Sequence, residues 1–204
     1  MQTYLDAPLP PRSADVRSLS LMALDLETTG LDPSADNIVS AGLVKIEGTH
    51  IQCSTAEHIL VRIDGSVEQS ATIHQITDTD LHQAVSERTM LDRLLDVLAG
   101  HVLLVHHAPM DLGFLNAACR RHYHRPLIIR TVDTLPMARQ LCERGDQRAR
   151  DGELRLHALR TAYGLPRYPA HNALSDALAT AELYLALLSR WAGTDALPLR
   201  TILS

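Results

Sequence analysis

The sequence predicts an α/β protein with a mixed central sheet and helices on both faces. Apolar runs that are typical of strands come first along the chain, between residues 19 and 62. From residue 84 onward, strand-like runs alternate with segments whose apolar residues recur at helical spacing. The first strands should therefore form an antiparallel meander, and the later ones should join the sheet through helical crossovers.

The first half of the chain is predicted to form three strands and one helix. Polar, turn-forming segments (LDPSADN and EGT) separate the three strands, and Gly100 ends the helix. The expected elements are strands at 19–26, 37–46 and 50–62, a loop through 73–81, and a helix at 84–99.

The second half is predicted to alternate between strands and helices. The apolar run HVLLVH indicates a buried strand, and the alanine- and leucine-rich stretch near the end indicates a long amphipathic helix. The expected elements are strands at 101–106 and 127–133, helices at 111–123, 133–144, 154–163 and 172–192, and loops at 143–153 and 164–170.

Length and composition indicate one folded domain. A chain of 204 residues with 46% hydrophobic residues can bury a single sizeable core. The Pro-rich, polar residues 1–18 are expected to be a loose N-terminal arm, residues 19–192 the domain, and 193–204 a C-terminal tail.

The cellular location is predicted from what the sequence lacks. The sequence contains no run of 18 apolar residues, the length that a membrane-spanning helix needs. The N-terminus has no apolar segment of the signal-peptide type. Cys53, Cys119 and Cys142 are odd in number and lack CxxC spacing, which favours a reducing compartment over disulfides or a zinc site. We expect a cytoplasmic protein with no membrane partner.

Four carboxylates stand where a metal site would need them. Asp25 and Glu27 are two residues apart in a predicted strand, so both side chains point to the same face. Asp111 lies at a strand-to-helix junction and Asp176 near the start of the long helix. Each alone would fit a solvent-exposed or capping position, but together they predict a site for Mg²⁺ or Mn²⁺.

The net charge of −5 opposes nucleic-acid binding unless metal is present. Two divalent cations would offset the four carboxylates and leave the loaded protein close to neutral. The low overall positive charge then favours an enzyme that binds a short single-stranded end over one that binds duplex tightly.

Three sequence blocks carry a resemblance to a known family. They are LDLETTGLD at 24–32, HHAPMDLGFL at 106–115 and HNALSDALATAE at 171–182. The chain resembles the DEDD superfamily of 3′→5′ exonucleases, in the subgroup with a catalytic histidine (DEDDh), and is similar to the proofreading epsilon subunits of bacterial DNA polymerase III. The resemblance implies a ribonuclease H-like fold and two Mg²⁺ or Mn²⁺ ions per site.

The resemblance also implies a role for each site residue. Asp25 would bridge both ions, with Glu27 and Asp176 on one ion and Asp111 holding the second largely through water. His171 would be the general base, because imidazole can take a proton at neutral pH. Residues expected to contact the terminal nucleotide are Thr28, Thr29, Gly30, Leu31 and Met110.

The second block departs from the family pattern at two positions. His107 stands where the family usually has Asn, and Met110 where it usually has Phe before the aspartate. Neither change removes a metal ligand, but both could alter how a terminal nucleotide packs.

Other polar residues are expected to have structural roles. We expect Asp133 to cap its helix or to anchor it through a hydrogen bond. The arginines of the 143–153 loop could contact substrate phosphate, although a solvated loop surface is the simpler interpretation. A second metal site is not expected among the remaining histidines, because these come from different elements. The arginines of the loop are Arg144, Arg148 and Arg150. The histidines from which no second metal site is expected are His101, His106, His107, His122 and His124.

The leading functional hypothesis is a 3′→5′ exonuclease that releases 5′-mononucleotides from single-stranded or frayed DNA, in proofreading or repair. The same chemistry on RNA ends, as in RNase T and oligoribonuclease, stays open. A non-catalytic polymerase-accessory module is the third possibility, although no clamp-binding QLxLF segment is present: Gln140-Leu141 continues CERGD. A nucleic acid with a free 3′ end is the expected partner and a polymerase or repair protein a possible one; the oligomeric state stays open.

Overall fold

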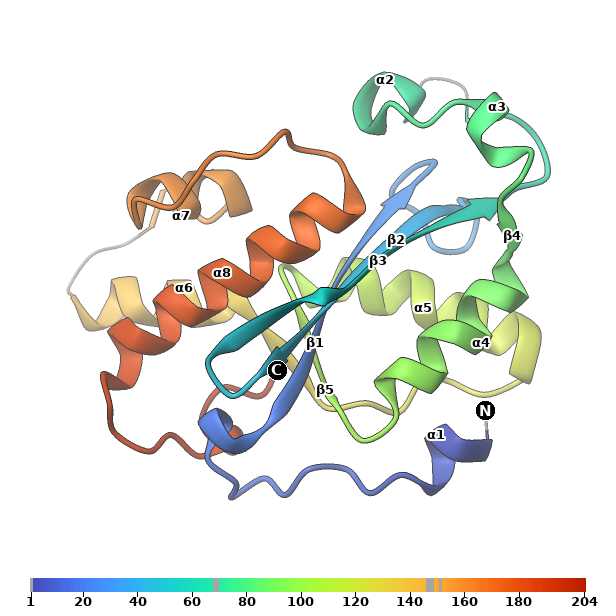
Figure 1. The fold of residues 1–204 in the computed structure, drawn as a ribbon. Helices are drawn as coiled ribbons and strands as arrows, with labels where there is room; N and C mark the ends of the chain where they lie inside the picture. Colours follow the sequence, from blue (N-terminus) through green and yellow to red (C-terminus); the bar gives the residue numbers. More distant parts are fainter. Residues whose placement is uncertain (1, 68–69, 146–148, 151) are drawn as a thin grey trace.

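A six-stranded mixed sheet forms the centre of the molecule. The computed structural model describes residues 2–67, 70–145, 149–150 and 152–204. The strand order is β4-β3-β2-β1-β5-β6, and helices cover both faces (Figure 1). The predicted α/β class with a mixed sheet is thus confirmed.

The first three strands form the predicted antiparallel meander. They are β1 (Ser20–Thr28), β2 (Ile38–Glu47) and β3 (His50–Arg62). Gly48 makes the tight turn between β2 and β3 at a φ of 60°, a conformation that favours glycine.

The remaining strands are short and parallel to their neighbours. β5 (Val102–Val105) lies beside β1, β6 (Thr131–Asp133) beside β5, and β4 (Val85–Ser86) beside β3. β1 is therefore central and has an antiparallel neighbour on one side and a parallel one on the other.

The helices connect and flank these strands. They are α1 (Gln2–Asp6), α2 (Ala71–His74), α3 (Asp78–Leu81), α4 (Glu87–Leu98), α5 (Ala108–Tyr123), α6 (Thr134–Arg144), α7 (Leu156–Ala162) and α8 (Ala173–Ala192), with 3₁₀ turns η1 (Val16–Ser18) and η3 (Leu199–Thr201).

Alternation along β1 divides the apolar interior into two cores. Leu21 and Ala23 pack with residues of α6 and α8, whereas Met22 and Leu24 pack with residues of α4 and α5. The figure shows these helix groups on opposite sides of the sheet (Figure 1). The odd-numbered positions of β1 thus face α8.

The predicted loose arm and tail are instead packed against the fold. Val16 and Leu199 are fully buried in the same core as α8, and the Val16 N–H donates to the Leu197 carbonyl at 2.9 Å. Tyr4 is also buried, and its hydroxyl donates to the Ile128 carbonyl at 2.6 Å. A few well-placed apolar residues thus anchor segments that are polar on average.

Several element boundaries differ from the prediction. β1 extends to Thr28, and the predicted loop through 73–81 contains α2 and α3. The predicted strand at 127–133 pairs only over Thr131–Asp133. α5 begins at Ala108, three residues before the predicted start, because Pro109 is tolerated in a first helical turn.

The start of one predicted helix also differs from the structure, and one predicted loop is only partly described. The predicted helix at 84–99 starts at Glu87, since residues 85–86 pair with β3 instead. The 143–153 loop falls partly outside the described residues.

No helix in the described part of the chain is long and apolar enough to cross a lipid bilayer.

Candidate active site

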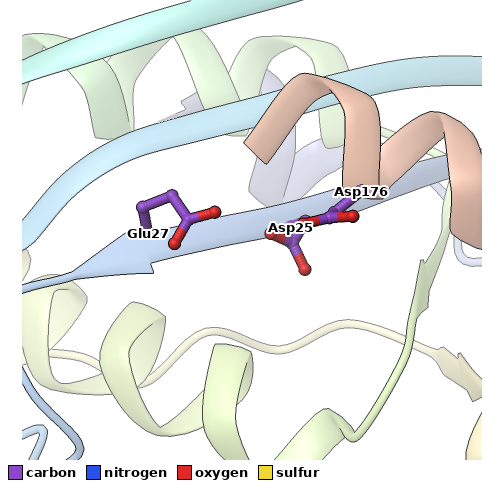
Figure 2. Close-up of side chains that lie close together, drawn as sticks. All are labelled: Asp25, Glu27 and Asp176. Carbon is purple, nitrogen blue, oxygen red and sulfur yellow. The ribbon is translucent and has the colours of Figure 1, made fainter. Parts of the chain in front are cut away.

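Three of the four predicted carboxylates meet above the centre of the sheet. Asp25 and Glu27 project from the same face of β1, and Asp176 comes from the first turn of α8. One oxygen from each lies within 4.8 Å of the others, and Figure 2 shows the three side chains side by side between β1 and α8. In the part of the chain that the structure describes, this is the one group of potential metal ligands.

The close contact between α8 and the sheet depends on Gly42. This residue of β2 pairs with Asp25 of β1, and a Cβ atom on it would lie 2.1 Å from the main-chain carbon of Ala173. Asn172 caps the helix by accepting the Ser175 N–H at 3.0 Å. A side chain at position 42 would push the start of α8, and with it Asp176, away from β1.

Asp111 is buried beside this group, in the first turn of α5, and is 4% exposed. Its turn is fixed by Asp133, whose carboxylate accepts the His107 N–H at 2.9 Å and the Ala108 N–H at 2.7 Å. The same carboxylate accepts the Leu135 N–H at 2.9 Å, so Asp133 caps α6, as predicted, and holds the start of α5 as well. The sequence predicted the cap of α6 but not the contacts with the start of α5.

Burial raises the proton affinity of all four carboxylates, and neighbouring carboxylates raise that of Asp25, Glu27 and Asp111 further. Burial raises the pKa of Glu27 to about 7, and Asp176 adds to the effect. Burial, followed by Asp111, Asp176 and Glu27, raises the pKa of Asp25 well above its usual value. Burial also raises the pKa values of Asp111 and Asp176. Full ionisation of the site therefore needs a counter-charge, and a hard divalent cation suits this donor set.

His171 lies on the loop that leads into α8, at the edge of the carboxylate group. Its main-chain N–H donates to the Asp176 carboxylate at 2.8 Å, and its side chain is exposed. The backbone φ is 64°, an uncommon value for a residue other than glycine. The structure thus brings the predicted base next to a predicted ligand, on a segment outside regular secondary structure.

Arg160 of α7, which the sequence did not single out, anchors this loop. The side chain is 4% exposed and forms an ion pair with Glu182 of α8 at 2.7 Å. Its guanidinium also donates to the Pro166 carbonyl at 2.6 Å and stacks 4.7 Å from the Tyr168 ring. The only sequence signal was an arginine next to apolar residues (Ala158 and Leu159) in a predicted helix.

The carboxylates open into a pocket of about 680 Å³, named here the carboxylate pocket. One wall carries the carboxylates of β1 and α8; the opposite wall is formed by α7 and the loop that follows it. The lining residues beyond the carboxylates include His106, Arg155, His157, Arg160, Arg167 and His171.

Comparison with known proteins places this arrangement in a family. The family model described as "Exonuclease" (RNase T type) matches residues 22–184 and so includes all the predicted site residues. The chain belongs to the exonuclease family of the DEDD superfamily.

Curated relatives share this exonuclease region. The chain is 31% identical to a DNA polymerase III PolC-type protein of Thermotoga maritima over 174 residues, which cover 81% of the chain and 12% of that relative. It is 29% identical to a DNA polymerase III subunit epsilon of Treponema pallidum, covering 85% of the chain and 79% of the relative. The chain thus spans about one eighth of the PolC-type protein.

A solved structure shares the fold. E. coli exonuclease I in complex with a dA16 oligonucleotide matches with a TM-score of 0.75 at 18% identity, covering 85% of the chain and 41% of that structure. The ribonuclease H-like fold expected from the sequence is confirmed by such neighbours.

Four of the five residues that we expected to contact the terminal nucleotide lie at the end of β1 and in the turn that follows it, beside α5. Pro33 of that turn packs against Gly113 of α5. The Thr28 hydroxyl donates to the Gly30 carbonyl at 2.6 Å, and the Leu31 side chain is 82% exposed.

The remaining two residues expected to contact the terminal nucleotide are Thr29 and Met110. The Thr29 hydroxyl donates to Asp36 at 3.2 Å, and Met110 is partly buried on α5. None of the five residues (Thr28, Thr29, Gly30, Leu31, Met110) lines the carboxylate pocket, although Thr28 directly follows Glu27, which does.

The remaining predicted polar residues are dispersed. Burial lowers the pKa of His106 to about 4, so its side chain is neutral at pH 7, and its Nδ1 contacts the Thr134 hydroxyl at 2.7 Å. Arg144 stacks 4.1 Å from the Trp191 ring and so faces α8, not the carboxylates. Arg148 lies outside the described residues. No second group of metal ligands forms among the described histidines.

Proposed function

We propose that this exonuclease removes 5′-mononucleotides one at a time from the 3′ end of single-stranded or frayed DNA, in proofreading or repair. The observation that carries the proposal is the convergence of Asp25, Glu27 and Asp176, with Asp111 buried beside them. The epsilon-type relative and the oligonucleotide-bound neighbour support DNA as the substrate and the bacterial cytoplasm as its location. A polymerase is a natural partner for a relative of an epsilon subunit.

In this proposal the carboxylates would hold two Mg²⁺ or Mn²⁺ ions, since carboxylate oxygens are the ligands that such hard cations prefer. Asp25, Glu27 and Asp176 each offer an oxygen within 4.8 Å of the other two, and the Asp111 carboxylate also acts on that of Asp25. In this proposal Asp25 would serve both ions, Glu27 and Asp176 would hold one, and Asp111 would hold the other. Bound ions would supply an activated water and neutralise the leaving 3′ oxygen.

His171 is proposed to take the proton from the attacking water. Its neighbour Asp176 accepts its main-chain N–H, which keeps the imidazole within reach of the carboxylate group. Its exposed ring can pass the proton on to solvent. The His171 loop therefore supplies the base, whereas β1, α5 and α8 supply the ligands.

The terminal nucleotide is proposed to lie against the Thr28–Leu31 turn, opposite Met110. Leu31 projects into solvent and could stack on a base without any rearrangement of the turn. A paired terminus would first have to be melted, at about 1.4 kcal/mol per base-pair step. Since mispaired ends are already frayed, selectivity for errors would need no base-specific contact.

The test is digestion of a 5′-labelled oligonucleotide on three DNA substrates: single-stranded, matched duplex and duplex with a 3′ mismatch. We expect a ladder that shortens from the 3′ end, fastest on the single strand and slowest on the matched duplex. A 5′-labelled RNA of the same sequence tests sugar preference. Early internal fragments, or cleavage of circular single strands, would contradict exonuclease action from a free 3′ end.

A further inference from the structure

A second pocket of about 950 Å³ adjoins the carboxylate pocket. The two share His106, Arg155 and Leu156, so one leads into the other across the start of α7. Because its lining is rich in arginine, we name it the arginine pocket; its charged residues are Arg139, Arg150, Arg155 and Glu143.

The charge of this pocket comes from the arginines. All three guanidinium side chains are exposed, and none forms an ion pair with a residue that the structure describes. The low pKa of His106 leaves that ring uncharged at pH 7. Glu143 is the one carboxylate among the described lining residues.

The sequence shows the same local excess of positive charge. Seven of the chain's 18 arginines fall within residues 139–167, against four carboxylates, although the whole chain carries a net charge of −5. Arg167 and Arg155 face the carboxylate pocket, and Arg139 faces only the arginine pocket. A line of guanidinium groups therefore leads away from the metal-ligand candidates in an otherwise acidic molecule.

We infer that the arginine pocket binds the phosphodiester backbone of the substrate strand on the 5′ side of the bond that is cut. The inference rests on the proposed function and deepens it, because it assigns the path of the uncut strand. Guanidinium groups suit this task since they can hold phosphate oxygens through two parallel hydrogen bonds. The pocket contacts backbone alone, so it binds any base sequence.

The consequence is a dependence on strand length. A substrate that ends at the scissile phosphate reaches only the carboxylate pocket, whereas a strand with several more phosphates also reaches Arg155 and then Arg139. Affinity should therefore rise from dinucleotide to octanucleotide, and the gain should weaken with salt. For single strands, the logarithm of the binding constant should fall with that of the salt concentration by about 0.7 for each phosphate contact.

The experiment compares Arg139→Ala and Arg155→Ala with Arg125→Ala as matched control. Arg125 is exposed just beyond α5, about 20 Å along that helix from Asp111 at 1.5 Å per residue, and no described residue forms an ion pair with it. The first readout is binding of labelled DNA of two, four and eight nucleotides in Ca²⁺. The second is the KM for an octanucleotide relative to that for the p-nitrophenyl ester of thymidine 5′-phosphate, which contains no upstream phosphate.

For Arg139→Ala and Arg155→Ala we expect the ratio of these two KM values to rise on the order of ten-fold, and the salt slope to fall by about 0.7 each. Arg125→Ala should change neither. Equal affinity of the wild type for two and eight nucleotides, or equal losses in the Arg125 variant, would overturn the inference. If the wild type cleaves neither the ester nor any oligonucleotide, the proposed function fails instead.

Discussion

The two walls of the carboxylate pocket are built differently. Asp25, Glu27 and Asp176 come from a central strand and the first turn of a long helix, where main-chain hydrogen bonds fix their positions. The opposite wall consists of the short α7 and a loop in which His171 has a positive φ and an exposed side chain. The first wall is acidic and partly to fully buried, and the second carries arginines, of which Arg155 and Arg167 are exposed and Arg160 is buried.

This difference separates two tasks. The acidic wall is organised before any substrate arrives, at the cost of mutual repulsion that a metal would relieve. Arg160 and Tyr168 anchor the loop of the α7 wall, but residues 165–171 lie outside regular secondary structure, so we expect this loop to adapt to the strand that binds. Changes in the first wall should alter chemistry for every substrate, whereas changes in the second should depend on the substrate.

The largest expected effect follows replacement of a carboxylate on the acidic wall. Asp25→Asn should lower kcat by about 10⁴-fold or more, equal to roughly 5.5 kcal/mol, because one ligand serves both proposed ions. The free energy of unfolding of the metal-free variant should not fall, since a buried charge is removed. Activity with Mn²⁺ and urea unfolding in EDTA measure the two.

Asp96→Asn is the matched control, since Asp96 is exposed on α4. It should leave both activity and stability near wild type. Turnover by the wild type in EDTA, or more than a tenth of wild-type kcat in Asp25→Asn, would refute the metal-dependent reading of this wall.

The next effect tests the loop on the opposite wall. His171→Asn should lower kcat by about 10²–10⁴-fold, the usual contribution of a general base. Asparagine tolerates the positive φ at this position, and the main-chain N–H to Asp176 is kept. Mn²⁺ affinity, measured by calorimetry, should therefore change little.

His50→Asn serves as its control because His50 is exposed at the start of β3. A His171 variant that loses Mn²⁺ affinity but keeps kcat at saturating Mn²⁺ would identify His171 as a ligand. The proposed division of tasks between the two walls would then be wrong.

A smaller effect concerns stability and pH. The pKa of Glu27 rises from 4.5 to about 7 on folding, so the folded state holds this proton more tightly than the unfolded state does. The protonated Glu27 side chain therefore stabilises the folded state fully below about pH 4.5, and this stabilisation is lost as the pH rises through 7. The loss in the free energy of unfolding from Glu27 amounts to roughly 3 kcal/mol. Metal-free protein should therefore lose stability between pH 5 and 8.

Glu27→Gln should reduce this loss, and Mn²⁺ should reverse it in the wild type because the cation replaces the protons. Urea unfolding at pH 5, 6, 7 and 8, with EDTA or Mn²⁺, measures the effect. An identical pH dependence in wild type and Glu27→Gln would show that folding does not raise the pKa of this carboxyl group.

The sequence predicts the acidic wall because local rules determine it. Period-two spacing is enough to put Asp25 and Glu27 on one face, and helix-start signals place Asp176 and, within three residues, Asp111. The α7 wall depends on contacts between distant segments, such as Arg160 with Glu182, which no local pattern shows.

The terminal segments illustrate the same limit. Leu203 forms a bridge with Val132 at the edge of the sheet, and the Ser204 N–H donates to the Thr131 carbonyl at 2.9 Å. The apolar residues of 127–133 predicted a longer strand, but only three of its residues find a partner strand. Edge pairing of this kind is decided by the whole fold.

The smallest expected effect concerns Leu31, which flanks the pocket outside both walls. Leu31 and Ile128 are both large apolar side chains on the surface, 82% and 62% exposed. Leu31→Ala should raise the KM for single-stranded DNA by about ten-fold, because the base would lose part of an apolar contact of roughly 1.5–3 kcal/mol. Ile128→Ala should leave KM unchanged, and both variants should keep their stability within about 0.5 kcal/mol. Equal KM values in the two variants would show that the terminal nucleotide does not bind at the Thr28–Leu31 turn. A fall in kcat without a change in KM would show that Leu31 instead helps to position the carboxylates of the acidic wall.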